Sequence, residues 1–275
     1  YDLLRSLMCI NRTFVGGYGR IFFMKFKFNK EKAIQIIELS DQTNSFDDSQ
    51  QDLTEKAVIS IKQMRRNMLN TGGKPKEIIL NYLHSKNISI LDVKKLEETI
   101  NQRVLEYSAK NTEEKLEELF HLIQLWGGNT GRNIYVMGGG FYNNINISSY
   151  KKLVDTAMNF VNLNNLINQI HNFKQDSTNI CTPFITKHTR FFSQHNKFLS
   201  WLPIYDSLLS YGLMSVWSKK HNKYIKVEKP SNPKTKKGKD ELLYYWTKMI
   251  ELSNELNKPL NSLERILFNH FRNDP

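Results

Sequence analysis

Apolar residues recur at helical spacing along most of the sequence from residue 30 onward. The segment "NKEKAIQIIELSDQ" has one broad apolar face, and "LTEKAVISIKQMRRNML" repeats the pattern further along the chain. The residues expected on the first face are Ala33, Ile34, Ile36, Ile37 and Leu39. Apolar side chains three and four residues apart are typical of amphipathic helices, whereas strands alternate with a period of two. Segments with the alternating pattern of strands are sparse, so the sequence predicts an all-α protein.

Two breaks in the helical pattern divide the chain. The segment "WGGNTGRNIYVMGGGFYNNINISS" is rich in Gly and Asn, which favour turns and loops. A later segment, from Lys219 to Lys239, holds nine Lys against one Glu and predicts a solvated loop, with contacts to a phosphate backbone as the alternative. The expected organisation is an N-terminal extension (1–29), a helical lobe (30–125), a central segment (126–217), a Lys-rich loop (218–240) and C-terminal helices (241–275).

The sequence contains no clear targeting or membrane segment. Asp2, Arg5 and Arg12 interrupt the apolar residues at the start of the chain, which argues against a signal peptide. Met24 is typical of a natural start, so we expect the residues before it to be either upstream translated sequence or non-native, and not part of the fold. The apolar window 198–217 holds a Pro and a charge near its middle, which favours a buried loop and helix over a membrane span.

Composition limits the classes of partner and compartment. The 275 residues are 40% hydrophobic and carry a formal charge of +12, which indicates a folded core and a polyanionic partner. AT-rich coding also produces an excess of Lys, so charge alone does not identify that partner as nucleic acid. Cys9 and Cys181 are the two cysteines and neither lies in a metal-binding pattern, which favours the cytoplasm and no metal or cofactor. We expect a monomer.

One carboxylate, Asp206, stands among apolar residues in "ITKHTRFFSQHNKFLSWLPIYDSLLSYGLMSVW". Burying a carboxylate without a partner costs several kcal/mol, so this Asp has either a hydrogen-bonding role or a chemical one. In the context "PIYDSLL" it is well placed as a helix N-cap. Lys187 lies nineteen residues earlier, and this spacing leaves room for a helix and a short turn that would bring the two residues together.

The segments "ITKHTRFF" and "FLSWLPIYDSLL" resemble the helix-hairpin-helix DNA glycosylases, in particular the bacterial branch similar to 8-oxoguanine glycosylases. In that superfamily a hairpin leads into a helix bearing a catalytic Lys, and an Asp follows a Pro-containing apolar turn at a similar distance. The segment "WGGNTGRN" also resembles the central region of the bacterial branch. The resemblance covers residues 110–217 and implies a two-lobed architecture.

The resemblance implies a bacterial enzyme that cleaves the N-glycosidic bond of a damaged or modified base in double-stranded DNA. Asp206 would be the acid/base residue, because a carboxylate near C1′ stabilises the positive charge of the transition state. Lys187 would be the nucleophile of an additional lyase reaction if burial lowers its pKa. The base would have to leave the duplex. The hypothesis for the substrate is a bulky modified base in foreign DNA, such as phage DNA. The enzyme would then have an antiviral role.

The chain departs from the family at the hairpin. The family hairpin has glycines that let backbone amides approach a phosphate, whereas this chain reads "ICTPFITK" without glycine. The sequence therefore predicts a degenerate hairpin, with a tight turn at Thr182 and Pro183. In place of the hairpin, Lys219 and Lys220 of the Lys-rich loop are the candidates for contacts with the DNA backbone.

Further candidates come from the central segment. The residues expected to contact DNA, the opposing base or the flipped base are Asn129, Arg132, Asn133, Trp126, Trp201 and Tyr205. Each aromatic residue has a packing role in the core as its alternative. Near the C-terminus, Asn261 and Glu264 have the spacing of a helix capping box. The alternative functions are a non-catalytic helical DNA-binding module, in which Lys187 and Asp206 form a structural pair, and a helical interaction protein that binds no nucleic acid.

Overall fold

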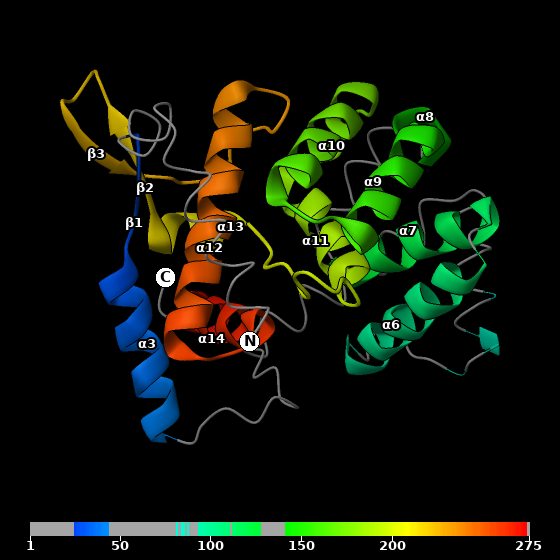
Figure 1. The fold of residues 1–275 in the computed structure, drawn as a ribbon, viewed down its shortest axis with the longest axis horizontal. Helices are drawn as coiled ribbons and strands as arrows, with labels where there is room; N and C mark the ends of the chain where they lie inside the picture. Colours follow the sequence, from blue (N-terminus) through cyan, green and yellow to red (C-terminus); the bar gives the residue numbers. More distant parts are fainter. Residues whose placement is uncertain are drawn as a thin grey trace.

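Helices dominate the computed structural model of the chain, which describes residues 25–43, 81, 84–85, 87, 93–110, 112–127 and 141–273 (Figure 1). The prediction of a mainly helical protein is thus confirmed. The described helices are α3 (Lys30–Thr43), α6 (Val93–Ala109), α7 (Glu113–Gly127), α8 (Phe141–Asn144), α9 (Ile147–Asn159), α10 (Leu163–Asp176), α11 (Thr182–Ser193), α12 (Ser207–Leu213), α13 (Lys236–Leu256) and α14 (Leu260–Asn273).

A small antiparallel sheet, which the sequence does not predict, accompanies the helices. Its strands are β1 (Phe26–Phe28), β2 (Met214–Ser218) and β3 (Lys223–Lys226), in the order β1-β2-β3. Phe26 and Phe28 are buried, and they pair with Val216 and Met214 of β2. These strands escape prediction because they are short and because every residue of β3 is exposed, so that β3 has no apolar face.

The structure also corrects the predicted Lys-rich loop at 218–240. Strand β3 lies inside it, and α13 already begins at Lys236, where the side chain of Thr235 accepts a hydrogen bond from Gly238 N. A Cβ atom on Gly238 would lie 2.0 Å from the carbonyl oxygen of Asn232, so this helical turn requires glycine. The segment is therefore a β-hairpin followed by an ordered approach to α13.

The helices gather into two groups (Figure 1). Helices α6 and α7 pack on each other and on α11, and α11 and α10 both pack on α9. Helix α3 packs on α14 and α12 in the other group, which also contains the sheet and α13. Residues 30–125 therefore do not form a single helical lobe as expected, because α3 packs with the C-terminal helices.

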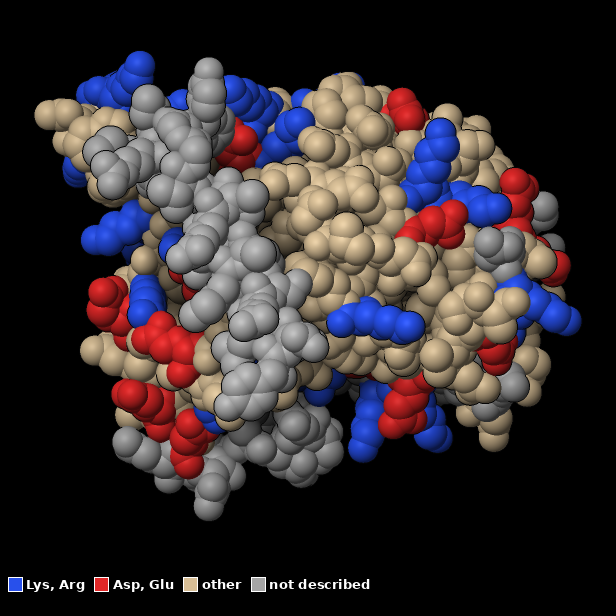
Figure 2. Space-filling view, viewed as in Figure 1, with Lys and Arg blue, Asp and Glu red and all other residues tan. Residues whose placement is uncertain are grey.

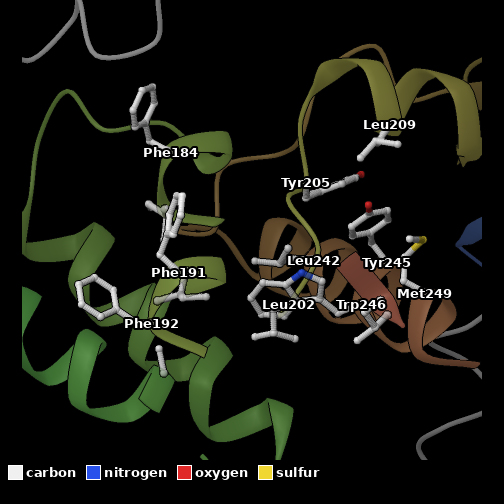
Figure 3. Packing of buried hydrophobic residues seen from close by; sticks show 14 of the residues in the cluster. Phe184, Phe191, Phe192, Leu202, Tyr205, Leu209, Leu242, Tyr245, Trp246 and Met249 are labelled. Carbon is white, nitrogen blue, oxygen red and sulfur yellow. The ribbon is translucent and has the colours of Figure 1, made fainter. Parts of the chain in front are cut away.

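The buried core is continuous between the two groups. Figure 3 shows buried aromatic residues of α11, the connecting segment with Leu202 and Tyr205, and apolar residues of α13 in succession. The rings of Tyr205 and Tyr245 stack with centroids 4.3 Å apart. The connecting segment is therefore packed on both sides, and this fixes the position of the residue that follows it, Asp206.

Candidate functional site

The segment 202–206 has no regular secondary structure, yet α11 binds its backbone. The amide of Leu202 donates to Oγ of Ser193 at 3.0 Å, and the amide of Tyr205 donates to Oγ1 of Thr186 at 3.1 Å. Both acceptors are buried hydroxyl groups. Thr186 directly precedes Lys187 in the chain, so this contact ties the approach to Asp206 to the helix that carries the lysine.

Helix α13 binds the same segment from its other side. The carbonyl oxygen of Pro203 accepts a hydrogen bond from Nε1 of Trp246 at 2.8 Å, and that of Ile204 accepts one from the hydroxyl of Tyr245 at 3.0 Å. Buried backbone groups without such partners would destabilise the fold. Side chains of two helices thus hold the backbone that presents Asp206.

Asp206 is the N-cap of α12, as the sequence predicts. Its Oδ1 accepts hydrogen bonds from the amides of Leu208 and Leu209, each at 3.0 Å. The side chain is half-buried. Burial raises the pKa of Asp206 above its ordinary value of 3.8, while these backbone hydrogen bonds and the positive charge of Lys187 act in the opposite direction.

Lys187 lies in the second turn of α11 and is also half-buried. Its Nζ donates a hydrogen bond to the carbonyl oxygen of Gly127, the last residue of α7, at 3.1 Å. The amine also lies 5.0 Å from the centre of the Phe184 ring. Burial lowers the pKa of Lys187, and the nearby charge of Asp206 partly offsets this effect.

Lys187 and Asp206 are therefore close enough to shift each other's pKa without forming a direct ion pair. Burial moves both groups toward their neutral forms. An amine with a lowered pKa can act as a nucleophile near neutral pH, and a carboxyl group beside it can exchange a proton with it. Titratable groups with opposite shifts of this kind are common at functional sites.

The link between α10 and α11 contains a residue in a backbone conformation that is uncommon for residues other than glycine. Asn179 has a φ of 52°, in the left-handed region that glycine adopts most readily and that asparagine tolerates. Its side-chain amide donates to Oδ1 of Asn144 at 2.6 Å, and the same oxygen accepts a hydrogen bond from Thr178. Asn144 thus stabilises the turn.

The predicted turn at Thr182 and Pro183 is wrong. Both residues belong to the first turn of α11, where the fixed φ of proline is favourable and its missing N–H needs no partner. The hydroxyl of Thr182 donates to the carbonyl oxygen of Ser231 at 2.9 Å. The start of α11 is thereby tied to the chain that leads into α13.

A buried ion pair lies one helical turn beyond Lys187. Arg190 of α11 pairs with Glu264 of α14, and both side chains are almost completely buried. Burial raises the pKa of Glu264, whereas the charge of Arg190 lowers it. The predicted capping role of Glu264 is wrong, because its carboxylate turns inward to Arg190. The partners are far apart in the sequence, so no local pattern could have identified the pair.

Trp201 lies beside this ion pair. The guanidinium of Arg190 is 5.4 Å from the centre of the Trp201 ring, within the range of a cation–π contact. Trp201 is half-buried and has a φ of 57°, a left-handed conformation that is uncommon for bulky residues. Backbone strain of this kind is often found at functional sites. Trp201 is thus the aromatic candidate with the most unusual geometry.

The remaining predicted residues are not brought to one place. Trp126 is half-buried and packs edge-on against Phe191, with ring centroids 4.9 Å apart. Tyr205 belongs to the core, and its hydroxyl donates to Glu241 at 2.9 Å, so it does not line an open pocket. Lys219 and Lys220 are exposed in the turn between β2 and β3, distant from α11 in Figure 1. Asn129, Arg132 and Asn133 lie outside the described residues.

His188, next to Lys187, has a structural role. Its Nδ1 lies 2.8 Å from the hydroxyl of Tyr150, and its Nε2 lies 3.1 Å from the amide nitrogen of Gln124. Burial, together with the charges of Lys187 and His121, lowers the pKa of His188 to about 3. The imidazole therefore stays neutral at physiological pH and joins α11 to α7 and α9.

The described part of the chain contains no group of three or more His, Cys, Asp or Glu residues arranged to hold a metal ion. Within the same ranges, no helix combines the length and the apolar character needed to cross a membrane. Comparison of the chain with protein-family models, curated proteins and solved structures finds no match.

Proposed function

We propose that the protein is a DNA N-glycosylase in which Asp206 and Lys187 perform the chemistry. The observation that carries this proposal is their placement: an acid and an amine, nineteen residues apart in the sequence, influence each other's pKa at half-buried positions. The hydrogen bonds from α11 and α13 to the segment 202–206 maintain this arrangement. The resemblance of these two segments to helix-hairpin-helix glycosylases supports the assignment, and the charge of +12 suits a DNA partner.

In the proposed reaction the target base leaves the duplex and C1′ of its sugar lies beside Asp206. As the bond between C1′ and the base breaks, its electron pair goes to the base nitrogen, which acquires a proton. The carboxylate of Asp206 stabilises the positive charge that develops on the sugar. With water as the nucleophile, Asp206 accepts a proton from water and the product is an abasic site.

Lys187 provides the second route. Its neutral amine attacks C1′ and gives up a proton to Asp206, so that a C–N bond replaces the glycosidic bond. Opening of the sugar ring converts this adduct into an imine. Removal of a proton from C2′ then expels the 3′ phosphate, and the strand breaks. The lowered pKa of Lys187 supports this step because it increases the neutral fraction of the amine.

For the substrate we propose a bulky modified base in foreign DNA, such as that of a phage. The segment "ICTPFITK" contains no glycine, so it lacks the feature with which the helix-hairpin-helix glycosylases that it resembles approach a phosphate. This difference makes routine repair of 8-oxoguanine the weaker hypothesis. Mass spectrometry of the released bases tests the substrate, and release of 8-oxoguanine alone would rule out our proposal for it.

The activity is tested by incubating wild type, Asp206→Asn and Lys187→Ala with DNA from several sources, including hypermodified phage DNA. Asparagine is a good N-cap residue, so Asp206→Asn removes the acid and keeps the cap. Alkali treatment reveals abasic sites, and borohydride traps an imine. We expect alkali-sensitive breaks with wild type only, and a trapped adduct that is absent with Lys187→Ala.

A non-catalytic DNA-binding module is the second candidate, and one observation favours it. The amine of Lys187 donates its hydrogen bond to the end of α7, a contact that a purely structural lysine would also make. If no DNA is cleaved while wild type and Asp206→Asn bind DNA equally, this second function replaces the first.

A further inference from the structure

The outer face of the β-sheet carries a defined set of side chains. Ser215 of β2 lies between Lys27 of β1 and Lys226 of β3, and Trp217 lies directly opposite Tyr224. Side chains alternate between the two faces of a strand, so these residues point away from the buried side that contains Phe26, Phe28 and Met214.

The aromatic pair on this face is open to solvent. Trp217 and Tyr224 are each 40% exposed, and their ring centroids lie 5.2 Å apart at an angle of 74°. Large aromatic residues gain free energy from burial, so two of them side by side on an outer face indicate a binding surface. Tyr211 of α12 adds a third exposed ring next to Lys226, whose Nζ lies 4.2 Å from the ring centre.

Positive charge surrounds the aromatic pair. Lys219 and Lys220 occupy the turn of the hairpin, and Lys226 is exposed on the same face of β3 as Tyr224. The sequence from Met214 to Val227 contains no Asp or Glu. Figure 2 shows basic side chains, Lys or Arg in blue, at the end of the molecule where Figure 1 places β2 and β3. Acids do occur at the margin of this region, where Glu228 follows β3 and Asp240 interacts with Lys25.

We propose that this outer face binds a single strand of DNA, with Trp217 and Tyr224 stacking on unpaired bases and the hairpin lysines contacting the phosphates. Exposed aromatic rings interspersed with cations are what single-strand binding requires, because rings stack on any base and lysines follow the backbone. A paired duplex offers its bases no such access. The site is separate from Asp206, since the seven residues of α12 alone span about 10 Å.

The test measures the affinity of the full chain for a fluorescent oligothymidylate of about 12 nucleotides, a length within the usual site sizes. One variant is Trp217→Ala, and a second combines Lys219→Ala and Lys220→Ala with Lys226→Ala, a change on the outer face of β3. The matched control combines Lys94→Ala, Lys110→Ala and Lys152→Ala, which removes the same charge from exposed positions outside the sheet. Thermal unfolding and the conservative Trp217→Phe variant show whether the sheet stays folded.

We expect Trp217→Ala to weaken binding at least about fivefold and Trp217→Phe to weaken it less, since a ring remains. The triple hairpin variant should lower the slope of log affinity against log salt by about 2, because about 0.7 of a unit is lost with each phosphate contact. The control triple variant should keep most of this slope.

Three results would overturn the proposal: equal binding by the hairpin and control variants, an unchanged affinity of Trp217→Ala, or a duplex of the same length that binds as tightly as the single strand. The outcome is independent of the proposed glycosylase. Asp206→Asn should bind the oligonucleotide like wild type whether or not wild type excises a base, so failure of one proposal leaves the other standing.

Discussion

At the scale of single residues, Asp206 combines two roles that differ in what they require. Capping of α12 needs only an oxygen that accepts hydrogen bonds from two amides. The proposed reaction needs an oxygen that can also be ionised and can take up a proton. Substitutions that keep or remove the acceptor therefore separate the structural role from the chemical one.

We expect Asp206→Ala to lower the free energy of unfolding by about 1 kcal/mol, the typical value of an N-cap, and Asp206→Asn to lower it by much less. Both variants should fail to excise a base. Urea denaturation measures the first quantity and alkali-sensitive cleavage the second. Equal stability of the alanine variant and wild type would show that the cap contributes little.

Lys187 should make the free energy of unfolding depend on pH in the alkaline range. Burial lowers its pKa below the ordinary value of 10.5, so the unfolded chain binds this proton more tightly than the folded chain does. Between the two pKa values the free energy of unfolding therefore rises with pH. Lys187→Met should remove this rise.

Urea denaturation of wild type and Lys187→Met at neutral pH, and again at an alkaline pH below 10.5, checks this prediction. Lys152→Met, a change at an exposed lysine of α9, is the control and should leave the pH dependence as it is in wild type. The same rise in all three proteins would contradict the proposed burial of the Lys187 amine.

At the scale of elements, the segment 202–206 depends on a hydroxyl group of α11. Thr186→Val keeps the shape of the side chain but leaves the buried amide of Tyr205 without its acceptor, which costs about 1–3 kcal/mol. We also expect slower excision in single-turnover kinetics, because Asp206 directly follows this amide. Thr186 is a positioning residue in this view.

Thr189→Val is the matched control for that change. Thr189 is buried in the same helix, but its hydroxyl donates to the carbonyl oxygen of Thr186 within α11 and joins no second element through that bond. Its replacement should cost less stability and leave the excision rate close to that of wild type. If the two substitutions have equal effects, Thr186 is not a positioning residue.

Elements specified by local chemistry could be predicted from the sequence, whereas those specified by distant partners could not. The start of α12 is predictable because its N-cap, Asp206, and the amides that this residue binds are close together in the sequence. Strand β1 exists because Phe26 pairs with Val216, a partner 190 residues later in the chain. Three residues carry too little pattern to reveal such a pairing.

At the scale of the whole molecule, the ion pair between Arg190 and Glu264 joins α11 to the C-terminal helix. A buried ion pair is costly to break from one side, because the remaining charge loses its partner but stays out of water. We expect Glu264→Leu to lower the free energy of unfolding by about 3–5 kcal/mol. The double variant with Arg190→Met should recover most of this loss, since it leaves no unpaired charge.

Urea denaturation of the two single variants and the double variant closes the cycle and isolates the interaction between the residues. Additive losses would indicate that the two side chains contribute separately.

The candidate site was partly accessible from the sequence. The spacing of Lys187 and Asp206 singled out both residues, and the structure places them close enough to interact. Arg190 and Glu264 were missed because an arginine inside a helix and a glutamate in a capping pattern both have ordinary local explanations. Their pairing follows only from the way α14 packs in three dimensions.

The hydrogen bonds to the segment 202–206 have a consequence for the motions of the backbone. Amides outside helices and strands usually exchange their hydrogens with solvent quickly, because local opening costs little. The amides of Leu202 and Tyr205 donate to buried hydroxyl groups, so they should exchange as slowly as those in the middle of α11. Hydrogen exchange measured by mass spectrometry would then reveal an irregular stretch of chain that opens only when the protein unfolds.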